Sequence, residues 1–444
     1  MANKVVCTVN NTINISVRKV KMFIVDQISP PKLGISGLTG TLSEEEKLIQ
    51  EMAHRFAKDV MRPIGEQLDK MTPEEVVAEG SPLYSVFQQL VESGLFDLQS
   101  ILEMSNEQKS RIMPLIFEEF GWGDSGLSIL IVATSFTSLT AMMTGDAELI
   151  KEFAGKIGCW IATQPDRGSD AADSDAQLLH PGTKQGRGNL LARIDGDEVV
   201  ISGQSSAWVT GAPIAQTAYV FCQCDYGDGI HKENGGLHTI SVLVPLTLPG
   251  VSKGKPLDKL GQRALPQGEI YFDEVRVPKK YVLAEKEDSE KAFFGTLTFA
   301  NMEMGFTFSG VARAAYEYAI EYVHERKQGG TEIINHQSVQ HRIFNIFQKS
   351  ETARAMAHRA AAYNYGENGP HVVASITSKT FVTQAAYDAV GEAMTLFGGN
   401  GLTREYPLEK LLRDARAALI EDGENNVLSL KAANWLSAAY KANQ

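Results

Sequence analysis

Carboxylates gather around a glycine near the C-terminus, in the run Glu421-Asp422-Gly423-Glu424 of segment 396–428. Like charges this close raise the pKa of at least one carboxyl group, and a raised pKa suits a proton acceptor that works near neutral pH. An acidic loop broken by glycine is also typical of a plain junction between two helices. From these residues alone, the loop can be interpreted either as the site of a general base or as a structural junction.

The glycines ahead of this loop and the helix that follows them could bind a ligand. Gly398 and Gly399 come after an apolar run, and glycine lets a ligand approach the backbone closely. Pro407 begins a helix with apolar residues at helical spacing, which leaves Lys410, Arg413 and Arg416 for solvent, partners or phosphate. The ordinary explanation of such basic residues is a solvated face.

This segment resembles the C-terminal signature of the acyl-CoA dehydrogenase family, in which FGGNG and EYPxEKxxRDA precede a five-residue spacer and the triplet Tyr-Glu-Gly. The glutamate of that triplet is the catalytic base of the family. The same spacer after RDA at 413–415 aligns Glu421 with the tyrosine, Asp422 with the glutamate and Gly423 with the glycine. The resemblance therefore implies that Asp422 is the catalytic base, one methylene shorter than glutamate.

Two further motifs match parts of the family that line FAD. TQPDRGSD at 163–170 is similar to the family's TEPGAGSD loop, and WVT at 208–210 stands where the family has WIT. A small loop rich in hydroxyl groups suits phosphate or flavin oxygens, and Trp208 offers a flat apolar wall. Taken alone, a tryptophan on a strand is more often a core residue. Gln164 replaces a glutamate and Arg167 replaces an alanine, which adds bulk and charge near the phosphates.

Other positions imply FAD contacts from a second chain. Arg326-Lys327 and His336-Gln337 keep the spacing of two dipeptides with which family members reach FAD across a subunit interface. We therefore expect a homotetramer or homodimer that binds FAD noncovalently. The FAD-binding residues that the resemblance implies are Ala162, Thr163, Gly168, Ser169, Trp208, Val209, Thr210, Arg326, Gln337, Gly398, Gly399 and Glu424.

The substrate side departs from the family. The resemblance implies that Ser169, Asn301 and Gly423 contact the substrate, but Asn301 stands where an arginine is usual. Ala300 occupies the alternative base position of the isovaleryl type, so the base is not relocated there. Glu424 replaces a threonine that contacts the flavin. Ordinary straight-chain specificity is therefore not expected.

The activity that the resemblance implies is acyl-CoA dehydrogenation. A carboxylate removes the α-proton of an acyl-CoA thioester while a hydride leaves the β-carbon for FAD, which gives an enoyl-CoA. Because the base is short and the pocket is altered, we expect a non-standard acyl group that is cyclic or bulky, such as a cyclohexane carboxyl-CoA. No GxGxxG fingerprint follows a strand, so we expect an electron-transferring flavoprotein rather than NAD as electron acceptor.

Three alternatives stay open. They are an alicyclic acyl-CoA dehydrogenase that eliminates at other ring carbons, a flavin-dependent monooxygenase on the same fold, and a degenerate member without catalysis. If Asp422 is not the base, the next candidates are Glu303, Asp124 and Asp97.

The composition is that of an ordinary globular protein of 444 residues, with 43% hydrophobic and 22% charged residues. A net charge of −12 argues against nucleic acid or an anionic membrane surface as partner. We find no run of ~18 consecutive apolar residues and expect no signal peptide. Four cysteines without a disulfide framework fit a reducing compartment, so we expect a cytoplasmic protein. Cys222 and Cys224 share a strand face without a second pair nearby, so no metal site is expected.

The first 157 residues are expected to form an extension and an all-helical domain. Residues 1–40 lack the arginine and serine content of a transit peptide and form an N-terminal extension of unknown role. In the domain 41–157, Ser43 and Glu46 form a capping box that starts a helix, and Pro63 ends it. Further helical runs are expected at 83–93, 108–120 and 127–143.

From residue 158 the pattern changes. Alternating runs rich in β-branched residues predict a β-barrel domain over 158–284, with a hairpin at Asp195-Gly196. Helical periodicity with small-residue faces predicts a helical bundle over 285–444. The predicted fold class is α+β multidomain, with an N-terminal α-helical domain, a middle β-barrel domain and a C-terminal four-helix bundle. The resemblance implies the same order.

Overall fold

The computed structural model describes residues 30–35, 37–38, 40, 42–173 and 185–444. The chain divides into two units, Met1–Leu42 and Ser43–Gln444, and the second unit carries the site. Most of the expected extension, residues 1–40, lies outside the described residues. In its described part, Gly34 and Gly37 form an isolated antiparallel bridge.

Helices make up the first part of the second unit. Their bounds are α2 (Glu44–Phe56), η1 (Ala57–Met61), α3 (Arg62–Asp69), α4 (Pro73–Val77), α5 (Pro82–Ser93), α6 (Leu98–Glu103), α7 (Asn106–Gly123), α8 (Ser125–Thr144) and α9 (Ala147–Phe153). α2 begins at the predicted capping box, because the Ser43 hydroxyl accepts from the Glu46 N–H and the Glu46 carboxylate accepts from the Ser43 N–H. The other three predicted helices are confirmed as α5, α7 and α8.

Pro63 does not end the first helix, so that prediction is wrong. α2 continues through the π-helical turn η1 into α3, and Pro63 lies in the first turn of α3. Proline lacks an N–H, and its ring crowds the carbonyl one turn earlier. The wider π-helical turn before Pro63 accommodates both effects, so the helical direction persists to Asp69.

The middle part is a β domain. Its strands are β1 (Trp160–Ile161), β2 (Leu191–Asp195), β3 (Glu198–Gln204), β4 (Val209–Thr210), β5 (Thr217–Asp225), β6 (Thr239–Pro245), β7 (Val251–Lys253), β8 (Gln267–Gly268), β9 (Ile270–Pro278) and β10 (Val282–Glu285). The main sheet has the order β10-β6-β5-β2-β3-β9-β7, with β1 paired to β5, and β4 pairs with β8. The predicted hairpin joins β2 to β3, with Asp195 opposite Glu198 and Gly196 at φ +60°.

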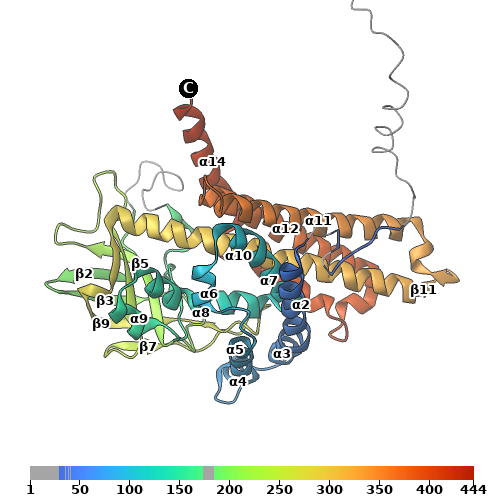
Figure 1. The fold of residues 1–444 in the computed structure, drawn as a ribbon. Helices are drawn as coiled ribbons and strands as arrows, with labels where there is room; N and C mark the ends of the chain where they lie inside the picture. The colour runs from blue at the N-terminus through green and yellow to red at the C-terminus, as the bar shows by residue number, and fades with distance from the viewer. Residues whose placement is uncertain (1–29, 36, 39, 41, 174–184) are drawn as a thin grey trace, which may run out of the picture. The chain divides into compact units, whose positions relative to one another are not determined.

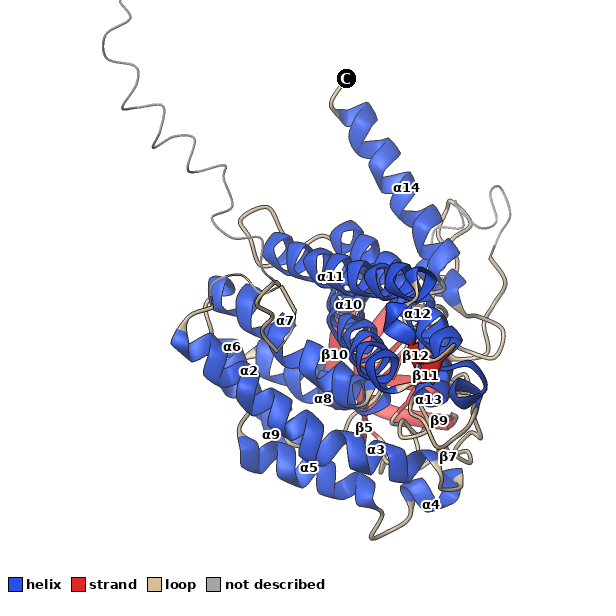
Figure 2. Cartoon of the chain, turned by 90° about the vertical axis from the view of Figure 1, so that its right-hand side faces the viewer, coloured by secondary structure: helices blue, strands red, loops and turns tan. Residues whose placement is uncertain are grey.

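Long helices form the C-terminal part. Their bounds are α10 (Lys286–Glu325), α11 (Gln337–Asn364), α12 (Val372–Phe397), α13 (Leu408–Ala418) and α14 (Asn425–Ala442), and the short elements between them are β11 (Lys327–Gln328), β12 (Thr331–Glu332), η4 (Ile333–Asn335) and η5 (Gly398–Leu402). α10, α11 and α12 pack on one another, and α7 packs against α10. Figure 1 shows α10 running from the β domain to β11 at the far end of the bundle. Figure 2 views the bundle from that end, with strands behind the helices.

Two glycines bring α7 and α10 into direct backbone contact. A Cβ on Gly121 would lie 1.9 Å from the Thr307 carbonyl oxygen, and a Cβ on Gly310 would lie 1.9 Å from the Glu118 carbonyl oxygen. Any side chain at either position would force the two helices apart. This contact fixes α10, and with it the α10 residues that face the cavity described below.

α8 is long enough and apolar enough to cross a membrane by length and composition, with a mean hydropathy of 1.7. In the structure, 67% of that stretch is buried inside the protein. α8 packs against α7, α9, α10 and β5, so it is a central helix of the fold.

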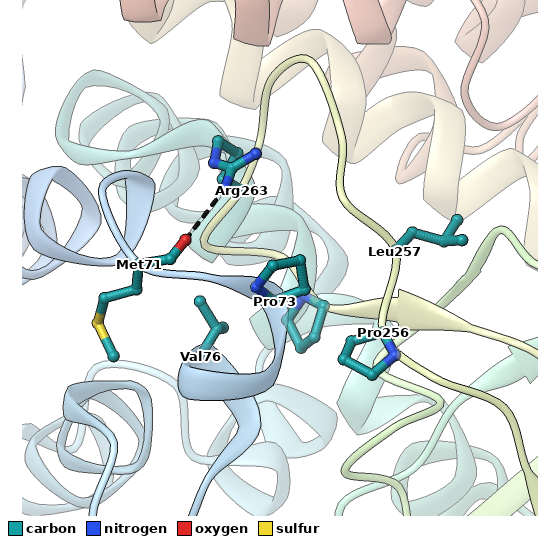
Figure 3. A pocket seen from close by; sticks show the side chains of 7 residues that line it. Met71, Pro73, Val76, Pro256, Leu257 and Arg263 are labelled. Atoms are coloured by element: carbon teal, nitrogen blue, oxygen red, sulfur yellow. Dashed lines mark hydrogen bonds between the residues drawn. The ribbon is translucent and has the colours of Figure 1, made fainter.

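A small pocket lies where α3 and α4 meet the loop before β8. Its volume of about 10 Å³ has room for at most one water molecule and is too small for an organic ligand. The Arg263 guanidinium donates to the Met71 carbonyl oxygen at 3.0 Å, as Figure 3 shows, and to the Asp69 carbonyl oxygen at 3.0 Å. This pocket therefore lies in the packing interface between the N-terminal helices and the β domain.

Candidate active site

A cavity of about 570 Å³ lies between the β domain and the bundle. Its walls come from α8, residues 160–172, residues 204–210, α10 and residues 420–423. The TQPDRGSD loop, the WVT segment and the acidic loop, which are far apart in the sequence, therefore meet at one place. The volume is that of an ordinary small-molecule site.

The acidic loop is held through its backbone. Asp422 lines the cavity at φ +49°, which is uncommon for a residue other than glycine, and Gly423 follows at +97°. The Asn301 amide donates to the Asp422 carbonyl oxygen at 3.0 Å. The Glu424 N–H donates to the Ser169 hydroxyl at 3.1 Å. These bonds hold a sparsely populated backbone conformation at the position of the carboxyl group.

A buried lysine on α12 lies against this loop. The Lys379 ammonium is fully buried and donates to the Gly423 carbonyl oxygen and to Oδ1 of Asn425, each at 2.7 Å. Burial lowers the pKa of Lys379 to about 8, against the attraction of Asp422 and Glu421. Lys379 was not among the predicted site residues, although a single lysine inside the apolar sequence of α12 was a usable signal.

The electrostatics of Asp422 differ from the sequence-based interpretation. Burial raises the pKa of its carboxyl group, and the positive charge of Lys379 opposes that rise. The neighbouring carboxylates have other roles. Glu421 accepts from the Gln262 amide at 2.8 Å, and Glu424 caps the N-terminus of α14. Burial, rather than an acidic cluster, therefore prepares Asp422 to accept a proton.

Two basic residues of α13 form ion pairs inside the protein. Lys410 bridges Asp124 at 2.6 Å and Asp414 at 2.7 Å, and Arg413 pairs with Asp69 at 2.8 Å. These two basic side chains are only 13% and 14% exposed, so the expected solvated face is wrong for them, whereas Arg416 is exposed as expected. The two ion-paired residues join α13 to α3 and to the start of α8.

Trp208 and Thr210 lie on the β-domain side of the cavity. Trp208 is 62% exposed, so it is not a core residue. The Gln267 amide fixes this segment by donating to the Trp208 carbonyl oxygen at 3.1 Å and to the Thr210 hydroxyl at 3.2 Å. The hydroxyls of Thr163 and Ser206 lie 2.6 Å apart. This wall combines an open aromatic face with hydroxyl groups, which suits a planar ring system.

The two altered side chains of the TQPDRGSD loop contact the β domain. Gln164 is buried, and its Oε1 accepts from the Leu190 N–H at 2.8 Å. The Arg167 guanidinium lies 3.4 Å from Oε1 of Gln185. A Cβ on Gly188 would lie 2.3 Å from Gln164 and 2.9 Å from Arg167, so both side chains pack over a glycine. The β domain takes up most of the added bulk, although both residues also line the cavity.

The predicted site residues fall into three groups. Those that line the cavity are Ala162, Thr163, Gly168, Ser169, Trp208, Val209, Thr210, Asp422 and Gly423. Asn301 and Glu424 support the acidic loop from behind. The residues at the other end of the bundle are exposed: Arg326, Gln337, Gly398 and Gly399.

One chain does not bring those exposed residues to the cavity. Arg326 follows Glu303, an α10 residue of the cavity wall, by 23 residues of helix, which is a distance of about 35 Å. Gly398 lies at the same end, because Tyr322 of α10 stacks on the adjacent Phe397 with ring centroids 3.8 Å apart.

Only one of the three alternative bases faces the cavity. Asp97 is exposed and caps α6. Asp124 caps α8 and pairs with Lys410. Glu303 of α10 is buried and lines the cavity. Glu303 is therefore a further carboxyl group of the cavity wall, in addition to Asp422 and Glu421.

Sequence models of known families match both parts of the chain that build the cavity. The acyl-CoA dehydrogenase middle domain matches residues 159–275, and the acyl-CoA dehydrogenase C-terminal domain matches residues 291–436. The chain belongs to the acyl-CoA dehydrogenase family. As an acyl-CoA dehydrogenase it is a flavoprotein oxidoreductase that acts on CH–CH groups.

Similar proteins cover nearly the whole chain. "Probable acyl-CoA dehydrogenase YngJ" of Bacillus subtilis is 28% identical over 89% of this chain and 98% of its own length. Cyclohexane-1-carbonyl-CoA dehydrogenase of Geobacter metallireducens is 27% identical over 87% of this chain and 96% of its own.

Solved structures share the fold. Butyryl-CoA dehydrogenase of Megasphaera elsdenii superposes with a TM-score of 0.75, at 23% identity over 90% of this chain and all of its own. A glutaryl-CoA dehydrogenase of Mycobacterium smegmatis, in complex with FADH2, has a TM-score of 0.73 at 22% identity, over 89% and 95%. A chain from the structure of the electron transferring flavoprotein of Acidaminococcus fermentans has a TM-score of 0.74 at 25% identity, over 90% and 99%.

Proposed function

We propose that this acyl-CoA dehydrogenase removes the α-proton of a bulky or cyclic acyl-CoA with Asp422 and gives the corresponding enoyl-CoA. The observation that carries the proposal is the position of the Asp422 carboxyl on the cavity wall, on a loop anchored by Asn301 and Lys379. A base held in one place removes a proton more efficiently than a mobile one.

Asp422 provides two groups for this step. Its carboxyl accepts the proton, and burial raises its pKa toward the working pH, where a general base is most effective. Within the described part of the chain, the Asp422 N–H makes no hydrogen bond, so it can donate to the thioester oxygen as negative charge develops there. The Asn301 amide fixes the peptide group that follows.

The cavity residues fit the ring system of FAD. Trp208 offers its open face, and Thr163, Ser169 and Thr210 offer hydroxyl groups. Nε1 of Trp160 is buried on the cavity wall and has no hydrogen-bond partner among the described residues, so it is a donor for a bound ligand. When bound, FAD supplies the acceptor for the hydride that leaves the β-carbon.

Three features support a bulky or cyclic acyl group. The aspartate is one methylene shorter than the glutamate of related enzymes, which leaves room beside the reacting carbon. Ala133 and Ala300 give the walls on α8 and α10 short side chains. A relative that covers almost the whole chain acts on cyclohexane-1-carbonyl-CoA.

The test is a screen of CoA esters for anaerobic bleaching of the bound flavin. Linear, branched, aromatic and alicyclic esters of matched carbon number are compared. We expect the best bulky or alicyclic ester to bleach the flavin about 10-fold faster than the best linear ester, since one misfitted methylene changes such ratios by about 10-fold or more. A linear ester that reacts fastest would refute the acyl class. A flavin-loaded protein that no ester bleaches would refute the dehydrogenation.

We also propose that a second copy of the chain completes the FAD-binding site. Arg326, Gln337 and the Gly398-Gly399 turn are exposed and far from their own cavity, and another chain can place them at it. Light scattering combined with flavin absorbance is expected to give a dimer or tetramer with full flavin occupancy. A fully flavin-loaded monomer would contradict this.

We further propose an electron-transferring flavoprotein as the electron acceptor. The likeness to a chain from an electron transferring flavoprotein structure supports this acceptor. Turnover with NAD as the sole acceptor would refute it.

A further inference from the structure

Glu303 is an acidic side chain in a largely apolar part of the cavity. It is only 6% exposed, and the surface it retains faces the cavity. On α10, Leu297 and Ala300 line the cavity within two turns of it, and Ile129 and Val132 of α8 line it from the other side. A buried carboxyl group among such residues costs free energy unless it is hydrogen-bonded.

Two hydroxyl groups satisfy one oxygen of Glu303 and leave the other for a ligand. The Thr307 hydroxyl donates to Oε1 at 2.5 Å, and the Ser128 hydroxyl lies 2.6 Å from Thr307 and 3.3 Å from the same Oε1. Among the described residues, no group donates to or accepts from Oε2. This oxygen is the part of the carboxyl group that is available on the cavity side.

The surroundings keep Glu303 protonated at neutral pH. Burial raises its pKa to about 8, the hydrogen bond from Thr307 opposes this, and the negative charges of Asp422 and Glu421 add to the rise. These two carboxylates face it from the loop after α13, and Ser128 faces it from α8. Glu303 is therefore an O–H donor, and a bound molecule supplies the acceptor.

We propose that Glu303 forms a polar subsite on the α8–α10 wall that binds an oxygen acceptor on the acyl group, so that the preferred substrate is an oxygenated acyl-CoA. This rests on the proposed function, because it assigns the α8–α10 wall to the acyl group. A purely hydrocarbon chain would cover the Glu303 carboxyl group without giving it a partner, which weakens binding by about 10-fold. A hydroxyl or carbonyl oxygen on the acyl group removes that loss.

The test measures ligand binding to the FAD-loaded enzyme. Six-carbon enoyl-CoA esters do not reduce oxidised flavin, so calorimetry gives their dissociation constants without turnover. One ester has no substituent, and the others each carry one ketone carbonyl beyond the double bond, which can only accept a hydrogen bond. We expect at least one keto ester to bind the parent protein about 10-fold more tightly than the unsubstituted ester at pH 7.

Two variants separate the possible roles of Glu303. Glu303→Gln keeps a hydrogen-bond donor of the same shape, so it is expected to keep the preference and to keep it above pH 8, where the parent protein loses it. Glu303→Leu removes the donor and is expected to bind all the esters within about 2-fold of one another. Flavin content and circular dichroism establish that each variant is folded.

Three results would overturn the subsite. They are a parent protein without a preference, a Glu303→Leu variant that retains the preference, and a Glu303→Gln variant that loses it at pH 7 although it is folded and binds flavin. Failure of the proposed function is a separate observation, because then no acyl-CoA bleaches the parent flavin.

Discussion

Asp422→Asn is expected to bind FAD and acyl-CoA as the parent does and to lose ~100 to 10,000-fold in the rate of flavin bleaching. The amide has the shape of the carboxyl group and leaves the backbone bonds from Asn301 and Lys379 in place, so the loop persists. What it lacks is a carboxylate oxygen basic enough to take the α-proton. Stopped-flow absorbance at the flavin band measures the rate, and titration with an enoyl-CoA measures the binding.

Asp422→Glu is the matched variant for this experiment. It restores the length of base that related enzymes use, so it is expected to stay active and to shift preference toward straight-chain esters. The position at φ +49° is no more costly for glutamate than for a typical residue, although it is more costly than for aspartate. An unchanged order of substrates would show that the short base does not determine acyl selection.

The pH profile of the parent protein offers an independent check on the base. Because burial raises the pKa of Asp422, the bleaching rate is expected to fall with decreasing pH through a midpoint above the ordinary value of 3.8. The residual bleaching rate of Asp422→Asn is expected to lack this decrease at low pH. A parent rate in that variant at any pH would place the base at another residue.

Arg313→Met is expected to cause a large loss of stability in the helical bundle. Arg313 of α10 is 2% exposed and lies 3.0 Å from Glu118 and 2.5 Å from Glu119 of α7. Methionine fills the space of the aliphatic chain but leaves two buried carboxylates without their main partner. Breaking a buried pair in this way costs about 3 to 5 kcal/mol.

The remaining partners do not replace Arg313. Arg354 still contacts Glu118 at 3.0 Å, and His54 still contacts Glu119 at 2.8 Å. The midpoint of thermal or urea denaturation measures the effect. Arg276→Met is the control, because Arg276 forms ion pairs at 2.6 and 2.8 Å on the exposed surface of β9 and is expected to change the midpoint little. Equal midpoint shifts in the two variants would contradict the assignment.

Local sequence patterns were sufficient to predict the helices and strands and the two loops that line the cavity. The capping box at Ser43 and the Asp-Gly hairpin at Asp195 each depend on residues within a few positions of one another, and both are present. The acidic loop and the TQPDRGSD loop were placed by motif spacing, and both line the cavity.

Patterns failed where a distant contact decides the outcome. The spacing of apolar residues in α13 predicted that its basic side chains face solvent. In the structure, Arg413 and Lys410 instead pair with Asp69 and Asp124, which lie about 300 residues earlier in the chain. Pro63 is a helix terminator by local rules, and a π-helical turn packed on α7 lets the helix continue. Such pairings cost conformational entropy that only the assembled fold offsets.

The sequence by itself determined the family, the order of helical and β parts, and the identity of the candidate base. The tertiary structure alone determined the surroundings of that base. It brought Lys379 against the acidic loop, placed Glu303 on the same cavity, and buried both of these side chains beside the half-buried Asp422. Burial and charge act through space rather than along the chain, so the pKa values that prepare the site follow from packing and not from the spacing of residues.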